Sequence, residues 1–402
     1  MRYGIEKSTA KGNIKAPPSK SMAHRLLICA ALSKEKCIIE NLDFSQDILA
    51  SIDCLKALGS QFEISDKKLS FCGRQETQDE ICLNVRESGS TLRFLIPIAL
   101  LTGKKISFSG SERLMQRPLE IYKKICDEQG ISFDLSENTL TVRGKLQAGE
   151  YILDGFISSQ FISGLLFALP LLEEDSKINI RPPFQSKPYV LMTIDALSKF
   201  NVHVELSDNV IYIKGKQKYK GQDMVVEGDW SNAAFLDAFN LIGGDVKISG
   251  LDENSLQGDK VYKEIFEQLK VENAKIDISD CPDLGPIAMA MAYKGGAVFS
   301  GTSRLRLKES DRSAAMAEEL KKFGIETDIK EDTMTVYKGE IRKPALAIDS
   351  HNDHRIAMAM AVLLSTCGGE LDGAEAVSKS LPSFFDMIES LGIEVKKDGF
   401  DL

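Results

Sequence analysis

The chain has few of the residues on which disulfide scaffolds, metal centres and membrane spans depend. Its 402 residues include eight cysteines with no C-x-x-C pair, four histidines and one tryptophan. The scattered cysteines predict reduced, mostly buried thiols. No apolar stretch reaches the roughly 18 to 20 residues that a membrane helix needs, and Met1–Lys7 lacks the apolar core of a signal peptide. We therefore expect a cytoplasmic protein with no membrane partner.

Basic residues are also fewer than acidic ones. Lysine and arginine total 50 against 59 aspartates and glutamates, which gives a net charge of −9. Proteins that bind nucleic acids or membrane surfaces generally need a basic field. The balance therefore excludes a general nucleic-acid binder, although a locally positive cleft for a small anion remains compatible with it.

A repeated pattern organises the chain. In each copy a helical run ends at Gly or Asn, and two alternating apolar segments separated by a polar turn follow, as in a capped helix leading to a hairpin. The copies start at Gly59, Gly130, Asn201 and Gly324, with a weaker copy at 270–278 and a truncated one at Gly392. The first two intervals are 71 residues, and the interval from Gly324 to Gly392 is 68. Six copies of about 67 residues account for the 402 residues.

The length exceeds what one hydrophobic core usually organises, so we expect two domains of three repeats each. Segments 161–166 and 287–291 are almost entirely apolar and predict buried helices. This pattern indicates an α/β (α+β) fold with helices inside and sheets outside. Buried helices whose amino termini reach a cleft would offer free N–H groups to an anion.

Two motifs combine hydroxyl and basic side chains at predicted helix starts. Residues 17–25 read PPSKSMAHR, with Lys20 four residues before His24 and Ser21 four residues before Arg25. Residues 88–93 read SGSTLR, and a glycine there allows an anion to approach the backbone closely. Taken alone, the first motif is equally compatible with a solvated helix start, and the second favours a simple capping turn.

Two further segments are dense in charge just before helical patterns. Residues 308–312 read KESDR, and the four-residue spacing of Lys308 and Arg312 predicts that they face one way. Residues 351–355 read HNDHR and contain half of the histidines. A zinc site there would need a further His or Cys at ligand spacing, which is missing, so we expect no metal.

In this order along the chain, the motifs resemble those of the 5-enolpyruvylshikimate-3-phosphate synthase family. The matching segments are residues 18–25, 88–93, 117–118, 158–161, 186–189, 282–283, 308–312 and 353–355, with Lys379 as the last basic residue. The family's fold agrees with the repeat count. It is a two-domain inside-out α/β barrel of six βαβαββ-like repeats, with the active site in the interdomain cleft. The resemblance places residues 1–18 and 228–402 in one domain and 19–227 in the other.

The resemblance also implies which residues hold each substrate. Shikimate-3-phosphate would be held by Lys20, Ser21, Arg25, Ser158, Ser159, Gln160, Ser186, Asp283 and Lys308. Phosphoenolpyruvate would be held by Lys20, Gly89, Arg117, Gln160, Arg312, Arg355 and Lys379. Arginines suit phosphoenolpyruvate because carboxylate and phosphate both accept paired hydrogen bonds.

The implied reaction transfers the enolpyruvyl group of phosphoenolpyruvate to the 5-hydroxyl of shikimate-3-phosphate and releases phosphate through a tetrahedral intermediate. In the family this step belongs to the shikimate pathway, which leads to chorismate and the aromatic amino acids. Asp283 resembles the base and Glu309 the acid, while Lys20 would assist both carboxylates and the leaving phosphate. The resemblance implies no cofactor, and we expect a monomer.

Two alternatives differ from this assignment. The sister enzyme that transfers enolpyruvyl to UDP-N-acetylglucosamine resembles the chain in its repeats. It begins, however, with a Lys-Asn motif and uses a loop cysteine, whereas this chain has Ser19-Lys20-Ser21 and no cysteine in a charged loop near Arg117. A non-catalytic anion-binding protein on the same scaffold is disfavoured by the presence of both Asp283 and Glu309.

Overall fold

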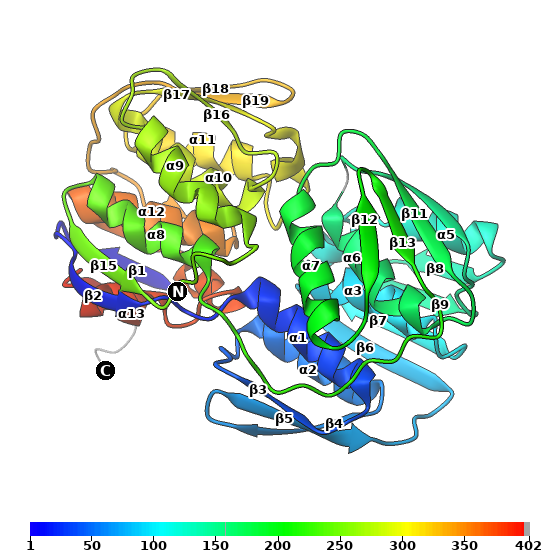
Figure 1. The fold of residues 1–402 in the computed structure, drawn as a ribbon. Coiled ribbons are helices and arrows are strands. Elements are labelled where there is room, and N and C mark those ends of the chain that lie inside the picture. The colour runs from blue at the N-terminus through cyan, green and yellow to red at the C-terminus, as the bar shows by residue number, and fades with distance from the viewer. Residues whose placement is uncertain (157, 398–402) are drawn as a thin grey trace. The chain divides into compact units, whose positions relative to one another are not determined.

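The computed structural model describes residues 1–156 and 158–397, and the chain forms two compact units (Figure 1). Unit 1 consists of Met1–Ser19 and Gly228–Leu402, and unit 2 consists of Lys20–Glu227. The first boundary lies one residue beyond the position expected from the sequence, and the second lies at the expected position. Each unit has its own hydrophobic core.

Unit 2 contains three repeats of helices and strands. The first comprises α1 (Lys20–Ser33), β3 (Cys37–Glu40), α2 (Gln46–Ala57), β4 (Ser60–Ser65) and β5 (Lys68–Arg74). The second comprises β6 (Glu80–Arg86), α3 (Gly89–Ala99), β7 (Lys105–Gly110), α4 (Glu112–Met115), α5 (Glu120–Glu128), β8 (Ser132–Ser136) and β9 (Thr139–Arg143). The third comprises β10 (Glu150–Asp154), α6 (Ser159–Ala168), the 3₁₀ helix η1 (Leu169–Leu171), β11 (Ser176–Arg181), α7 (Lys187–Lys199), β12 (Val204–Ser207) and β13 (Val210–Ile213), and β14 (Met224–Val225) follows it.

The repeats share one sheet topology. In the second repeat the order is β6-β7-β9-β8, with β6 parallel to β7 and both β7 and β8 antiparallel to β9. The third repeat has the same order, β10-β11-β13-β12. A helix connects the parallel strands, as such crossovers require, and the predicted hairpins form the other half of each sheet. The βαβαββ prediction is confirmed for these repeats.

Unit 1 contains the other repeats. Its elements are β1 (Arg2–Ile5), β2 (Lys11–Lys15), α8 (Trp230–Leu241), β15 (Asp245–Ser249), η2 (Gly258–Val261), α9 (Tyr262–Gln268), β16 (Ala274–Asp277), η3 (Pro282–Leu284), α10 (Gly285–Met291), η4 (Ala292–Lys294), β17 (Ala297–Ser300), η5 (Ser303–Leu307), α11 (Arg312–Lys322), β18 (Thr327–Ile329), β19 (Thr333–Val336), β20 (Ile348–Asp349), α12 (His354–Cys367), β21 (Gly369–Asp372), η6 (Ala374–Lys379), α13 (Phe384–Ser390) and β22 (Val395–Lys397). The sheet β16-β17-β19-β18 repeats the topology seen in unit 2. The terminal sheet, β20-β21-β1-β22, takes one strand from the amino terminus.

One expected copy of the repeat is not a hairpin. The weak pattern at residues 270–278 corresponds to a single strand, β16, which pairs in parallel with β17 and opens the next repeat. Within residues 1–156 and 158–397 the fourth repeat therefore lacks the usual hairpin, and β15 pairs only with β2 in a two-stranded sheet. The interpretation of 270–278 as a hairpin copy was wrong, because one alternating segment cannot distinguish a lone strand from half of a hairpin.

The two units exchange their first strands. By its place in the repeat, β2 would pair with β3, but β14 pairs in parallel with β3 instead. Conversely, β2 pairs in parallel with β15, which follows β14 in the chain. This exchange makes unit 1 discontinuous in sequence, because β2 belongs to it although α1 belongs to unit 2.

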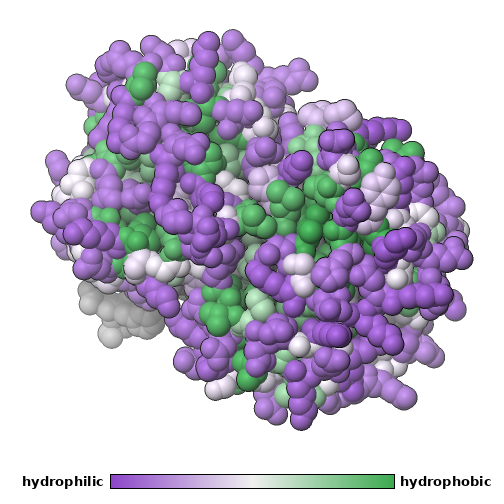
Figure 2. Space-filling view, viewed as in Figure 1, coloured by the Kyte–Doolittle hydropathy of each residue, from purple (hydrophilic) through white to green (hydrophobic). Residues whose placement is uncertain are grey.

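Helices lie inside each unit and strands lie outside. In α6, nine of ten residues are buried, and in α12 twelve of fourteen are buried. In the strands, by contrast, buried and exposed residues alternate. Every second residue of β6 and β10 is buried against the core, and most of the residues between them are exposed to water. The visible surface over β16–β19 is accordingly mostly hydrophilic (Figure 2). The predicted arrangement, helices inside and sheets outside, is confirmed.

The structure bears on two expectations from the sequence, one about the cysteines and one about membrane-spanning helices. All eight cysteines are free, and five of them are buried. In the described part of the chain, no helix is both long enough and apolar enough to cross a bilayer. These findings agree with the predicted thiols and with the absence of a long apolar run in the sequence.

The contact between α3 and α6 yields a test of the fold. A methyl group at Gly164 in α6 would overlap the Tyr122 hydroxyl and the carbonyl oxygen of Arg93. We expect Gly164→Ala to lower the free energy of unfolding by about 2 kcal/mol, measured by urea denaturation, because the close helix contact must open. Gly4→Ala is the control, since a methyl group there meets its nearest atom at 3.5 Å. Equal stability of both variants would contradict this packing.

Candidate active site

In unit 2 the predicted site residues lie mostly at the amino-terminal ends of helices, where free N–H groups favour anions. Lys20, Ser21 and Arg25 belong to α1, Gly89 to α3, and Ser159 and Gln160 to α6; Ser158 and Ser186 directly precede α6 and α7, and Arg117 lies between α4 and α5. Ser158 caps α6 by accepting a hydrogen bond of 3.3 Å from the Gln160 N–H. The sequence therefore located these helix starts correctly.

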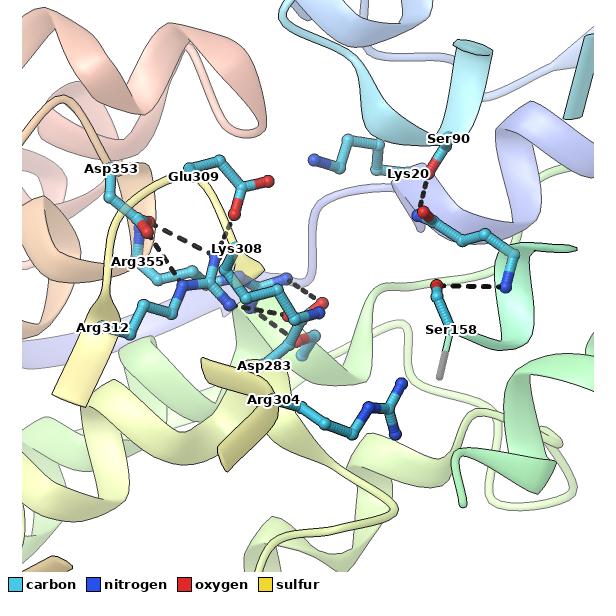
Figure 3. A network of polar contacts seen from close by, with 12 residues as sticks. Lys20, Ser90, Ser158, Asp283, Arg304, Lys308, Glu309, Arg312, Asp353 and Arg355 are labelled. Carbon is cyan, nitrogen blue, oxygen red and sulfur yellow. Dashed lines mark hydrogen bonds and ion pairs between the residues drawn. The ribbon is translucent and has the colours of Figure 1, made fainter. Parts of the chain in front are cut away.

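Gln160 links the ends of α3 and α6. Its amide Nε2 donates to Ser90 Oγ at 3.0 Å, and its Oε1 accepts from Arg93 Nη1 at 3.2 Å. Figure 3 shows the bonds to Ser90 and to Ser158. Arg93 was part of a recognised motif but not of the predicted binding set, and the structure places it directly beside that set.

Gly89 lies against two guanidinium groups. A methyl group built on Gly89 would come within 2.9 Å of Nη1 of Arg93 and of Nη1 of Arg117. The backbone at the start of α3 therefore approaches both cations closely, and only glycine leaves this space open. Two arginines beside a helix amino terminus form a corner suited to a carboxylate or phosphate.

The basic residues of α1 have partners that the sequence did not reveal. Lys20 Nζ forms an ion pair of 2.8 Å with Asp47 in α2. The buried Arg25 donates from Nε to Thr193 Oγ1 at 2.9 Å and from Nη2 to the Tyr189 carbonyl at 2.8 Å. Burial lowers the pKa of Arg25 to about 10. No sequence signal pointed to Asp47, which lies in an ordinary first helical turn.

In unit 1, Arg312 is the centre of a charged network (Figure 3). Its side chain is 1% exposed and contacts three carboxylates. Nη1 lies 2.8 Å from Asp283 Oδ1, Nη2 lies 2.9 Å from Glu309 Oε2, and Nε lies 2.9 Å from Asp353 Oδ2. Burial would lower the pKa of Arg312, but the charges of Asp353, Glu309 and Asp283 outweigh it and raise this pKa.

Asp283 is bound by three cations. Its Oδ1 contacts Lys308 Nζ at 3.2 Å as well as Arg312, and its Oδ2 lies 3.5 Å from Arg355 Nη2. Burial would raise the pKa of Asp283, but Lys308, Arg355 and Arg312 outweigh it and hold this pKa well below its usual range. Asp283 therefore stays ionised at neutral pH, with the more weakly bound Oδ2 better able to accept a proton.

Lys308 and Arg312 converge for a reason other than their spacing. Lys308 directly follows η5, while Arg312 begins α11, so the two do not share a helical face as expected. Instead both reach the same oxygen of Asp283. Lys379 lies in η6 and donates to the Asn352 carbonyl at 2.6 Å, just ahead of Asp353, which caps α12.

Two residues of this network were missed from the sequence. Ser231 in α8 accepts a hydrogen bond of 2.6 Å from Arg355 Nη1. Asp259 in η2 accepts from Ser231, and burial together with the charge of Asp283 raises the pKa of Asp259 to about 6. Neither residue stands in a charge-dense motif, so only the tertiary contacts associate them with Arg355.

Fold and site together define a class of protein. Repeats with inward helices, whose amino termini carry arginine, lysine and serine, are typical of a protein that binds small phosphorylated anions. The family model for EPSP synthase (3-phosphoshikimate 1-carboxyvinyltransferase) matches residues 5–388. The chain belongs to the EPSP synthase family.

The relatives and solved structures agree with that membership. The chain is 42% identical over 420 aligned positions to the 3-phosphoshikimate 1-carboxyvinyltransferase of Clostridium kluyveri, with 98% of each sequence covered. It is 40% identical to the enzyme of the same name from Clostridium perfringens, covering 96% of this chain and 97% of the relative. An EPSP synthase structure from Acinetobacter baumannii superposes with a TM-score of 0.79 at 24% identity, covering 98% of this chain and 100% of the other, and supports the fold.

The Arg312–Asp353 pair yields a stability prediction. Asp353 is 0% exposed and Arg312 is 1% exposed, so removing the Asp353 charge takes away the most deeply buried of the three carboxylates that compensate this cation. We expect Asp353→Asn to lower the free energy of unfolding by about 3 kcal/mol in urea denaturation. Asp311→Asn is the matched control, because Asp311 caps α11 at a more exposed position and Asn caps helices equally well. Similar losses in both variants would contradict the special role of this pair.

Proposed function

We propose that the protein transfers the enolpyruvyl group of phosphoenolpyruvate to the 5-hydroxyl of shikimate-3-phosphate, with release of phosphate. The names of the family and of its members at about 40% identity support this activity. The observation that carries the proposal is the fork of Arg312, which holds Asp283 and Glu309 through its two terminal nitrogens. One rigid guanidinium therefore positions the two carboxyl groups that the chemistry needs.

In the first step a C–O bond forms between the acceptor and phosphoenolpyruvate. The 5-hydroxyl oxygen attacks C2 as its proton passes to Asp283, while the acid form of Glu309 donates a proton to C3. The product is a tetrahedral intermediate in which C3 has become a methyl group. The low pKa of Asp283 keeps this carboxylate unprotonated until the attack begins.

In the second step both proton transfers are reversed. The Glu309 carboxylate takes a proton from the methyl group as the bond between C2 and the phosphate oxygen breaks. The protonated Asp283 returns its proton to the departing phosphate, so both carboxyl groups regain their first state. Lys20, Lys308 and Arg312 are the cations that we assign to stabilising the charge on that phosphate.

The binding assignments follow the chemistry of each side chain. For shikimate-3-phosphate we assign Lys20, Ser21, Arg25, Ser158, Ser159, Gln160, Ser186, Asp283 and Lys308. For phosphoenolpyruvate we assign Lys20, Gly89, Arg117, Gln160, Arg312, Arg355 and Lys379. Support comes from the arginine corner at Gly89 and from the hydrogen-bonded group around Gln160. We add Arg93 to the phosphoenolpyruvate set because its guanidinium borders the same glycine.

The proposal extends to the whole molecule. The residues that we assign to each substrate belong to both units. Phosphoenolpyruvate carries its own activated group, so the proposed reaction needs no cofactor. We also propose that the protein is a cytoplasmic monomer.

Substrate turnover tests the proposal directly. Purified protein given shikimate-3-phosphate and phosphoenolpyruvate should release phosphate, and UDP-N-acetylglucosamine should not replace the acceptor. Glu309→Gln should lower kcat by about 10² to 10⁴ because Gln cannot donate a proton. Glu318→Gln, a change of the same kind at an exposed position, is the control. Release only with the sugar nucleotide would favour the sister enzyme, and release with neither would favour a non-catalytic anion binder.

The close approach at Gly89 gives a prediction about one substrate. Gly89→Ala should displace the ends of Arg93 and Arg117, since a methyl group comes within 2.9 Å of both. We expect the KM for phosphoenolpyruvate to rise about tenfold, while the KM for shikimate-3-phosphate stays within about twofold. Steady-state kinetics with each substrate varied in turn measures both values. An unchanged KM for phosphoenolpyruvate would contradict the assignment of this corner.

A further inference from the structure

Glu319 is a buried carboxylate whose role the proposed mechanism leaves open. Its side chain is 0% exposed, and it accepts hydrogen bonds from Lys322, from His351 and from the backbone N–H of Asp349. The distances are 2.8 Å to Lys322 Nζ, 2.9 Å to His351 Nε2 and 2.9 Å to the Asp349 nitrogen. Burial would raise the pKa of Glu319, but these three donors outweigh it and lower this pKa.

A metal ion is the first alternative for this cluster. Ligand atoms of Glu318, Glu319 and His351 lie within 4.8 Å of one another. However, the Lys322 ammonium contacts both oxygens of Glu319 and supplies the positive charge that a metal would bring. The donors already present therefore satisfy Glu319, and a cation would have to displace them.

The segment that Glu319 holds has a strained backbone. His351 and Asn352 have φ values of 50° and 52°, in the left-handed region that side chains rarely adopt. Two consecutive residues in this region cost free energy and persist only when surrounding contacts impose them. Glu319 supplies such contacts through the ring of His351 and the backbone of Asp349.

This strained turn directly contacts or precedes residues of the candidate active site. The carbonyl of Asn352 accepts the hydrogen bond of Lys379, and Asp353 and Arg355 follow directly in the chain. Two residues of helix α11 contact this segment. Arg312 forms an ion pair with Asp353, and Glu319 accepts hydrogen bonds from the Asp349 N–H and the His351 ring. Residues 312 and 319 are seven apart, so they lie on one face of α11.

We propose that Glu319, acting with His351, is a positioning residue that fixes the turn at 350–353 and thereby sets Lys379 and Arg355 for phosphoenolpyruvate. The inference rests on the proposed function for the identity of that substrate. It adds two residues outside the set that touches substrate. It also explains the first histidine of the HNDHR motif, which the proposed mechanism does not use.

Kinetics of matched variants test the inference. We expect Glu319→Gln and His351→Gln to raise the KM for phosphoenolpyruvate about tenfold or more, with the KM for shikimate-3-phosphate within about twofold. The double variant should be no worse than Glu319→Gln, because both changes break the same contact. Glu318→Gln, at the exposed neighbouring position, should behave as the unaltered protein. Effects that multiply in the double variant, or equal rises in both KM values, would overturn the inference.

A second measurement does not depend on turnover. The hydrogen bond to Glu319, with the charges of Glu319, Asp349 and, least of all, Glu318, raises the pKa of His351 above its usual value. This pKa should therefore fall in Glu319→Gln and fall much less in Glu318→Gln. NMR titration of the four histidines gives these values, and His351→Gln assigns the signal. An unchanged His351 pKa in Glu319→Gln overturns the inference whatever the activity. Inactivity of the unaltered protein and of Glu318→Gln alike would instead contradict the proposed function.

Discussion

The buried guanidinium of Arg312 is the interaction on which the arrangement of unit 1 depends. One side chain joins the 3₁₀ helix that carries Asp283, the segment before α11 that carries Glu309, and the cap of α12. Each carboxylate would be costly to bury alone, and the three together compensate a cation that has almost no access to water. The positions of the two proposed proton carriers are therefore set by one group.

Repetition explains how an acidic chain can build a basic site. The basic and hydroxyl side chains of the candidate site are concentrated at the amino termini of α1, α3, α6 and α7. The rest of the surface therefore does not have to be basic. Helix termini add partial positive charge, so few basic residues suffice. The net charge of −9 reflects the outer strands and loops and says little about the site.

The parts of the fold that depend on local sequence signals could be predicted, whereas the pairing of strands distant in the sequence could not. Glycine caps and alternating strands revealed the hairpins, for example β8 with β9 after Gly130. The exchange of β2 and β14 could not be inferred from residue patterns, because a local pattern does not say which distant strand a parallel strand pairs with, and only the family resemblance placed residues 1–18 with 228–402. The lone strand β16 was taken for a hairpin because one alternating segment is compatible with either structure.

In the candidate site, too, residues within sequence motifs were predicted, whereas their partners from other parts of the chain were not. A charge-dense motif located Glu309 and Arg312, the family resemblance located Asp283, and the structure joins both carboxylates to Arg312 directly. The partners of Lys20 and Arg25 stayed hidden because Asp47 and the Tyr189 carbonyl come from distant helices. Glu319 was missed because a glutamate in an amphipathic helix normally faces water, and only its contacts identify it as buried.

The central claim is that Glu309 adds a proton to C3 of phosphoenolpyruvate and removes one again. The most direct measurement is to run the reaction in deuterium oxide and to examine the enolpyruvyl product by proton NMR and mass spectrometry. A methyl intermediate exchanges protons with solvent through Glu309, so the account predicts deuterium in the terminal methylene group of the product. A product free of deuterium would contradict the account, because phosphate would then have been displaced without protonation of C3.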